Sequence, residues 1–211
     1  MRRLIPLLPL VALLAACGGA GFPDRPNADA TIVLAGAPDA LDAPLATTVQ
    51  RGFDEAEGVT LTLKRPRAPD AGLRALESNR AQFAALDAAT LSAHRDLVGV
   101  MALRADTSGA RAPSLVLTTT REDLREDPSV ARATVRGLVR GYATAQVDPP
   151  SSLSDLKTMF PRLDQATIER QFDANQQQVF PPGRPLGGLP REDPRYDPTI
   201  ANNAQAALSD D

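Results

Sequence analysis

Four aspartates follow predicted strands, where carboxylates can bind ligands: Asp39, Asp42, Asp70 and Asp87. In an open parallel sheet ligands bind beyond the carboxyl ends of the strands, so the four could gather on one rim. Such a rim would suit a cationic or amine-rich ligand, or a weak Ca²⁺ site built from hard oxygen ligands, and it would repel a sulfonate or nitrate. The competing interpretation is structural. Asp42, Asp70 and Asp87 each precede a predicted helix and could cap it, which stabilises a helix by about 1 kcal/mol.

The only cysteine, Cys17, is a second group with distinctive chemistry. It follows two arginines, an apolar segment at residues 4–14 and two alanines. The apolar segment is too short to cross a membrane, which takes about 20 residues, and this order of residue types is typical of a secretory signal. Leu14-Ala15-Ala16-Cys17 resembles the bacterial lipobox, which implies that Cys17 is lipidated. The lipid would anchor the protein to the bilayer of the bacterial cell envelope, with the protein facing the periplasm or the exterior. We expect a signal peptide over residues 1–16 and a tether over residues 17–30; a small cysteine in an ordinary cleavage region is the alternative.

Composition narrows the chemistry further. The chain has 211 residues, 43% of them hydrophobic, with one His, one Cys and no Trp. One Cys excludes an intramolecular disulfide, and one His excludes a His-rich zinc site. The net charge of −3 argues against a partner such as nucleic acid. Because the sequence has no nucleophile–base pair, metal-ligand cluster or cofactor fingerprint, we expect a binding protein without a cofactor rather than an enzyme.

Strands and helices alternate along the body of the chain, which is typical of an α/β fold with a parallel sheet. The expected strands are short and rich in β-branched or aliphatic residues: 31–34, 59–63, 82–86, 97–103 and 113–119. The expected helices are residues 42–57, 70–78, 87–94, 127–146, 152–160, 164–178 and 199–208. We therefore expect an α/β lobe over residues 31–178, a parallel sheet flanked by helices, and a Pro/Gly-rich wrap with a last helix over residues 179–211.

The first strand–helix–strand unit carries residues that match a known pattern: Pro38, Gly52, Phe53, Glu57 and Gly58. Further segments follow in the same order: 76–87 (LESNRAQFAALD), 97–103, 115–142 and 180–189. Together they resemble a family of ABC-transporter solute-binding proteins that includes binders of aliphatic sulfonates and of the thiamine pyrimidine precursor. The resemblance implies a periplasmic-binding-protein-like fold with C-terminal helices, an importer permease as partner, and a small organic solute as ligand.

The same resemblance implies that one lobe is missing. Family members have two α/β lobes with the ligand between them, and the second lobe is inserted after the strand that corresponds to residues 97–103. Here only residues 104–114 reach the next strand, so a deletion on the order of 100 residues, about one domain, is implied. After the first strand, Asp39 and Asp42 stand where pyrimidine-binding members have Asn and His. The change at Asp42 argues against the activity of the related fungal pyrimidine synthases, which use their own His as a substrate source.

We therefore expect a membrane-anchored solute-binding lipoprotein, or a one-lobe relic of one, with weak or lost solute binding. The alternative is a lipoprotein that binds no solute and acts through protein partners. Arg132, Arg136 and Arg140 repeat every four residues and so line one face of a predicted helix, which is either solvated or a contact for an acidic partner.

The C-terminal segment should cover the surface that the second lobe covers in two-lobed relatives. We expect residues 179–198 to pack back onto the lobe, because a large exposed apolar patch is unusual in a monomer. The expected anchoring side chains are Val179, Phe180, Leu186, Leu189 and Tyr196.

Overall fold

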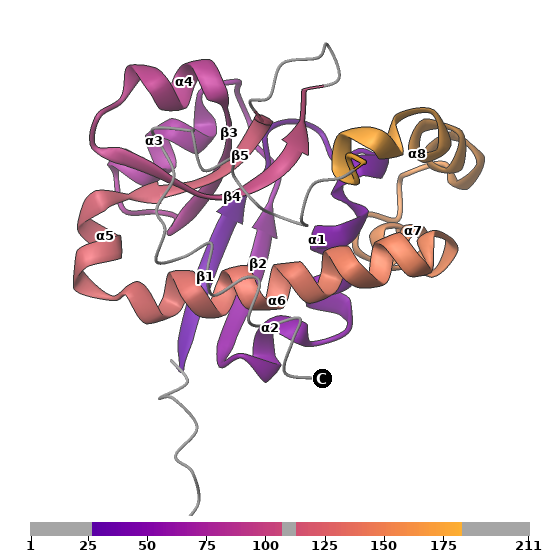
Figure 1. Cartoon of the computed structure of the whole chain (residues 1–211), viewed down its shortest axis with the longest axis horizontal. Coiled ribbons are helices and arrows are strands. Elements are labelled where there is room, and N and C mark those ends of the chain that lie inside the picture. Colours follow the sequence, from indigo (N-terminus) through magenta and orange to yellow (C-terminus); the bar gives the residue numbers. More distant parts are fainter. Residues whose placement is uncertain (1–26, 107–112, 183–211) are drawn as a thin grey trace, which may run out of the picture.

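The computed structural model describes residues 27–106 and 113–182, which form one five-stranded sheet with helices around it (Figure 1). The strands are β1 (Ala28–Val33), β2 (Val59–Lys64), β3 (Phe83–Asp87), β4 (Leu97–Ala105) and β5 (Pro113–Thr120). Their order in the sheet is β2-β1-β3-β5-β4. All five expected strands are confirmed, and β1 begins at Ala28, within the segment expected to be tether.

The sheet is mostly parallel, as expected, but one strand runs the other way. β1 is parallel to both β2 and β3, whereas β5 is antiparallel to both β3 and β4. Only residues 106–112 join β4 to β5. A parallel crossover needs about a dozen residues or more, so a connection of this length reverses the chain direction.

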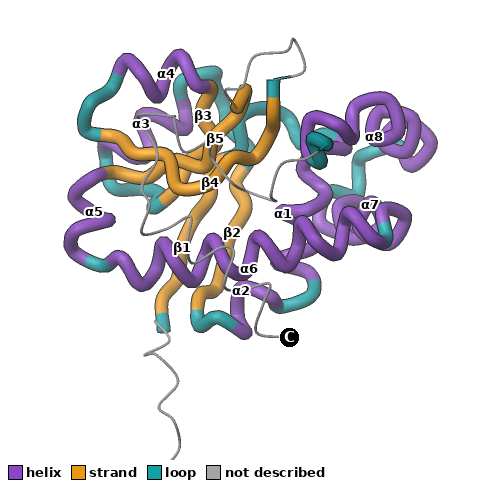
Figure 2. Tube along the Cα trace, viewed as in Figure 1, coloured by secondary structure: helices purple, strands orange, loops and turns teal. Residues whose placement is uncertain are grey.

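Helices cover both faces of the sheet (Figures 1 and 2). The N-terminal helices are the 3₁₀ helix η1 (Ala40–Asp42), α1 (Ala43–Gln50), α2 (Phe53–Ala56), α3 (Ala71–Glu77) and α4 (Ala88–Ala93). The later helices are α5 (Arg121–Glu126), α6 (Pro128–Val147), α7 (Pro149–Met159) and α8 (Gln165–Val179). α7 and α8 lie beside α1 at one side of the sheet, where α7 contacts both α1 and α6 (Figure 2). The expected helix at 199–208 lies outside the described residues.

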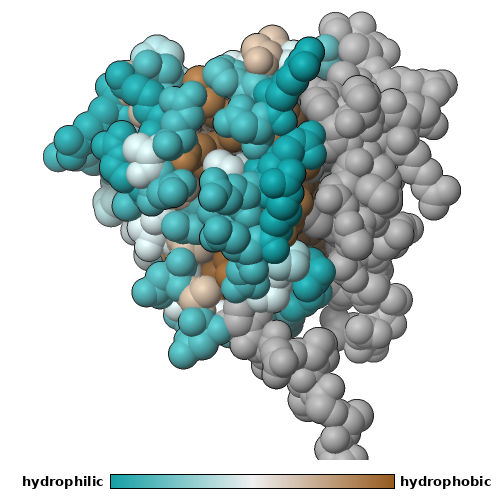
Figure 3. All heavy atoms as spheres, turned by 90° about the vertical axis from the view of Figure 1, so that its left-hand side faces the viewer, coloured by the Kyte–Doolittle hydropathy of each residue, from teal (hydrophilic) through white to brown (hydrophobic). Residues whose placement is uncertain are grey.

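Alternate residues of β1, β3 and β5 enter two separate cores, one on each face of the sheet. In β1, Ile32 packs in the core beneath α1 and α6, whereas Val33 packs in the core beneath α3 and α4. The edge strand β2 is covered on one face only, because Leu61 is buried while Thr60 and Thr62 are exposed. The side of the molecule that carries α3, α4 and α5 presents a mainly hydrophilic surface with apolar residues visible between the polar ones (Figure 3).

The helix expected over residues 42–57 is broken into η1, α1 and α2. The break falls at Gly52, whose φ of +63° is left-handed and therefore suits a residue without a Cβ atom. The turn redirects the chain so that Asp54 of α2 is buried, and its Oδ2 accepts a 2.8 Å hydrogen bond from the backbone N–H of Leu61. A glycine inside an apolar helical pattern does not reveal such a break.

α6 packs very closely against α1. A Cβ atom at Gly141 would collide with Oγ1 of Thr48 and would lie 2.5 Å from the carbonyl oxygen of Pro44. The Thr48 hydroxyl donates a 2.9 Å hydrogen bond to that same carbonyl oxygen, so it occupies a fixed position. Gly141 is therefore the residue that allows the two helices to approach.

The arginine face of α6 contacts this chain's own α2. Nε of Arg136 donates a 2.6 Å hydrogen bond to Glu57, and the guanidinium of Arg140 lies 3.7 Å from the same carboxylate. Arg140 also lies 5.0 Å from the ring centroid of Phe53. Two of the three arginines thus have an acidic partner within the chain.

None of the helices in the described ranges is long and apolar enough to cross a membrane.

The start of the C-terminal segment packs onto the fold. Val179 is buried, and the ring of Phe180 makes edge contacts with Tyr142 and Phe172 at centroid distances of 6.4 and 6.2 Å. The other expected anchors, Leu186, Leu189 and Tyr196, lie outside the described residues, as does Cys17.

Candidate functional site

The loop after β1 brings two of the four candidate aspartates together at the carboxyl end of the strand. The side chain of Asp39 accepts a 2.8 Å hydrogen bond from the backbone N–H of Leu41, and the backbone N–H of Asp39 donates a 3.1 Å bond to Asp42. The two residues thereby form a reciprocal cap on η1. Asp42, which we expected to cap α1, makes no side-chain cap bond to that helix.

Arg104, from the end of β4, joins these two carboxylates. Its guanidinium donates to both oxygens of Asp39, at 3.1 and 2.9 Å, and to Oδ1 of Asp42 at 2.8 Å. One guanidinium between two ionised carboxylates leaves a formal charge of −1. We call these three side chains the Asp39–Asp42–Arg104 cluster. Arg104 is not among the residues expected at this site from the sequence.

Burial and the ion pairs shift the pKa values of the cluster in opposite directions. Asp42 is only 6% exposed, and burial raises its pKa to about 6 although the neighbouring Arg104 acts to lower it. Burial alone would lower the pKa of Arg104, but the two carboxylates outweigh this effect and raise it. Beside the cluster, the buried hydroxyl of Tyr142 donates a 3.0 Å hydrogen bond to the carbonyl oxygen of Leu103. This bond ties the end of β4, and with it Arg104, to α6.

The other two candidate aspartates interact with the helices that follow them. Asp87 caps α4, because its two oxygens accept bonds from the backbone N–H and the hydroxyl of Thr90 at 2.8 and 2.7 Å. These bonds hold the pKa of Asp87 below its ordinary value. Asp70 makes no cap bond and instead pairs with Arg74 at 2.8 Å, with both side chains exposed. Among the described residues, no group of three or more acidic, His or Cys side chains is placed to hold a metal ion.

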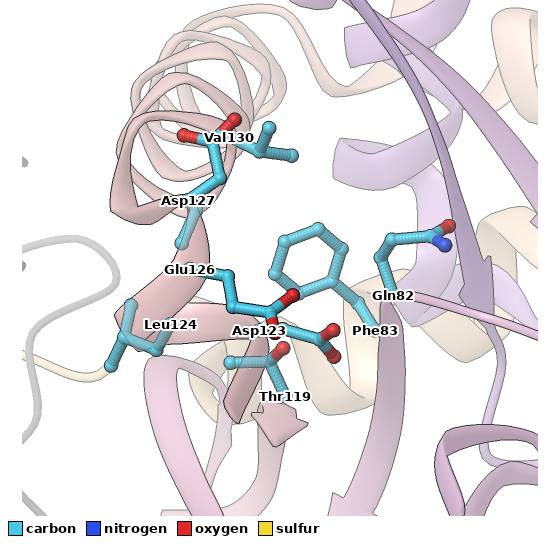
Figure 4. Close-up of a pocket in the computed structure, with 9 residues that line it drawn as sticks. Gln82, Phe83, Thr119, Asp123, Leu124, Glu126, Asp127 and Val130 are labelled. Carbon is cyan, nitrogen blue, oxygen red and sulfur yellow. The ribbon is translucent and has the colours of Figure 1, made fainter. Parts of the chain in front are cut away.

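A small cavity lies at the opposite end of the sheet, between β3, β5 and the junction of α5 and α6 (Figure 4). Its volume is about 120 Å³, and the ring of Phe83 faces it together with carboxylate-bearing residues of α5 and the cap of α6. Two of these carboxylates are already used in helix caps, Asp123 with Thr120 and Asp127 with Ser129. Ligand pockets are typically about 300–1,000 Å³, so this cavity is too small to be the main site.

The fold is similar to that of several solved structures, at low sequence identity. No family model matches the sequence, and no curated protein matches it. One similar structure is a conserved Candida albicans gene product described as having the generic periplasmic binding protein fold (9% identity, TM-score 0.54). The similarity covers 86% of this chain and 89% of that one.

Two further similar structures are ligand-binding proteins. The alkanesulfonate-binding protein SsuA from Xanthomonas axonopodis pv. citri, bound to MOPS, has 11% identity and a TM-score of 0.54 over 89% of this chain and 93% of that one. The ligand-binding component of an ABC-type import system from Staphylococcus aureus, with zinc bound, has 11% identity and a TM-score of 0.55 over 86% and 91%. At these identities the likeness establishes the fold alone. It confirms the expected fold class, an α/β lobe of the periplasmic-binding-protein type with C-terminal helices.

Proposed function

We propose that this protein is a membrane-anchored solute-binding lipoprotein of an ABC importer for a small organic solute. The observation that carries the proposal is the Asp39–Asp42–Arg104 cluster at the carboxyl edge of a periplasmic-binding-protein-like lobe. That edge is where ligands bind in open α/β sheets. Two of the similar structures are ligand-binding proteins, one of them of an ABC-type import system, which supports a solute-binding role.

Within the cluster we assign the ligand contact to Asp39. Its side chain is 40% exposed, whereas those of Arg104 and Asp42 are 18% and 9% exposed. Arg104 and Asp42 therefore position the Asp39 carboxylate, and the formal charge of −1 favours a ligand that donates hydrogen bonds or carries a positive charge. An aminopyrimidine such as the thiamine pyrimidine precursor has donors of this kind. Asp70 and Asp87 are weaker candidates because they lie outside this cluster: Asp70 pairs with Arg74, and Asp87 caps α4 through Thr90.

The affinity should be low. Tight capture relies on burying about 70–90% of a ligand in a cleft, and one lobe covers a ligand from one side only. We expect a Kd weaker than ~10 μM, which corresponds to less than about 7 kcal/mol. The loss of the second lobe stays a prediction.

Calorimetry tests the solute site. The full chain is titrated with the thiamine pyrimidine precursor, a polyamine and an alkanesulfonate, and the titrations are repeated with Asp39→Asn. Asp70→Asn is the matched control because it removes one exposed carboxylate outside the cluster. Weak binding of the amine-bearing ligands, lost in Asp39→Asn alone, is the expected result. No saturable binding up to millimolar concentration would overturn the proposal and favour the protein-partner alternative, and sub-micromolar binding would refute the one-lobe affinity argument.

A further inference from the structure

A basic hollow lies along the flank of α3, beside the edge strand β2. Its volume is about 620 Å³, and four small or apolar residues and five cations line it. The cationic side chains are Lys64, Arg65, Arg67, Arg74 and Arg80, and all five are exposed. None of the described residues that line it carries a carboxylate.

The fold gathers these cations from separate elements. Lys64 pairs with Val33 across β1 and β2, so both lie on the face of the sheet that α3 partly covers. The chain leaves β2 through Arg65 and Arg67, α3 contributes Arg74, and the turn after α3 contributes Arg80. In that turn, Nε of Arg80 donates a 2.7 Å hydrogen bond to the Ser78 hydroxyl.

Most of these cations form no ion pair with a carboxylate of the described part of the chain. Arg74 has a carboxylate partner in Asp70, at 2.8 Å, but this pair is more than half exposed. In residues 27–106 and 113–182, no carboxylate forms an ion pair with Lys64, Arg65 or Arg67. The chain as a whole carries −3, so the hollow is a local reversal of its charge. Neighbouring like charges repel, and a bound anion would relieve that repulsion.

We propose that the basic hollow binds a small phosphate- or pyrophosphate-bearing ligand from solution. Guanidinium groups present paired donors that match phosphate oxygens, and the volume of the hollow is within the range of small-molecule sites. A concave site on a chain of negative net charge fits a small ligand better than a membrane surface. None of the residues that line the hollow belongs to the Asp39–Asp42–Arg104 cluster.

Isothermal titration with inorganic pyrophosphate tests the proposal. The full chain carries Cys17→Ser so that no acyl chain contributes, and the salt concentration is kept near ~50 mM to limit screening. The test variant is Arg65→Gln/Arg67→Gln. The control variant, Arg95→Gln/Arg125→Gln, removes the same charge from two exposed positions outside the hollow. A parallel measurement uses sedimentation with phosphatidylglycerol vesicles and with phosphatidylcholine vesicles.

We expect pyrophosphate to bind, and its Kd to rise about tenfold or more in the test variant, because that variant loses the charge-assisted hydrogen bonds of two guanidinium groups. The control variant should stay within about twofold of the parent, because screened surface charges contribute little. An equal loss in both variants would assign the binding to net charge and overturn the proposal. Absence of pyrophosphate binding would overturn it too, including the case in which only phosphatidylglycerol vesicles bind. Neither result depends on whether Asp39 binds a solute.

Discussion

Replacing Arg104 with Gln should destabilise the fold considerably. The substitution removes three hydrogen bonds and leaves the carboxylates of Asp39 and Asp42 facing each other, with Asp42 only 6% exposed. Breaking a buried ion pair typically costs about 3–5 kcal/mol. Asp39 is partly solvated, which reduces the penalty, so we expect a loss of about 2–4 kcal/mol in the free energy of unfolding at pH 7.

A matched ion pair on the surface provides the control. Arg74 and Asp70 are also 2.8 Å apart, but their side chains are 55% and 56% exposed. Arg74→Gln should therefore cost less than about 1 kcal/mol. The double variant Arg104→Gln/Asp42→Asn should be more stable than Arg104→Gln alone, because it no longer buries an uncompensated charge.

The pH dependence separates burial of charge from simple loss of contacts. The pKa of Asp42 is about 6 in the folded protein against an ordinary value of 3.8, so the folded state binds the proton more tightly. This group therefore adds stability as the pH falls from 7 towards 4, by at most about 3 kcal/mol, and that contribution is lost again as the pH rises through 6. Without Arg104 the pKa of Asp42 rises further, so the cost of Arg104→Gln should be smaller at pH 5 than at pH 7.

Denaturant unfolding at pH 7 and pH 5 measures both effects. The parent, Arg104→Gln, Arg74→Gln and the double variant are compared at each pH. If Arg104→Gln costs no more than Arg74→Gln, or if its cost grows at pH 5, the buried-charge reasoning is wrong.

Three further substitutions or truncations test the packing and the anchor. Gly141→Ala should lower the free energy of unfolding by about 1–3 kcal/mol because the new methyl group has no space. Gly36→Ala is the control, because nothing lies within 4 Å of a Cβ atom at that position. Its free energy of unfolding should stay within about 0.5 kcal/mol of the parent's. Truncation after Gln178 removes the ring contacts of Phe180 and should lower Tm by several degrees; a Tm within one or two degrees of the parent would show that the tail is only a linker. Cys17→Ser should release the protein from membranes, and mass spectrometry that finds an unmodified N-terminus beyond residue 17 would contradict the lipoprotein proposal.

Elements that depend on local sequence could be predicted, and those that depend on tertiary contacts could not. The cap of α4 by Asp87 follows from the residue type and the helix start alone, and the structure confirms it. The direction of β5 depends on how far the connection after β4 can reach, which the strand pattern does not encode. The break at Gly52 depends on Asp54 reaching the backbone of β2, a contact between separate elements.

The candidate site was predictable only in part, for the same reason. Asp39 and Asp42 could be selected because they follow a predicted strand. Arg104 is 62 to 65 residues away from them in the chain, and its partners are determined by the sheet order. The one signal available was its position as the first charged residue after a buried apolar strand. Such a residue lies at the carboxyl edge whenever the strand is parallel to β1.

Asp70 has different surroundings from Asp39 and Asp42. We grouped it with Asp39 and Asp42 because each follows a strand, but its carboxylate is bound by Arg74 at the border of the basic hollow. The loop after β2 therefore brings more positive than negative charge to its end of the sheet. A ligand that approaches β2 would meet cations, whereas one that approaches the ends of β1 and β4 would meet the net negative cluster. A bipolar solute, or two different ligands, would fit this arrangement better than a single cation. The titrations with Asp39→Asn and Arg65→Gln/Arg67→Gln distinguish these two cases. The affinity for a single shared ligand must fall in both variants, whereas each of two separate ligands is affected by one variant only.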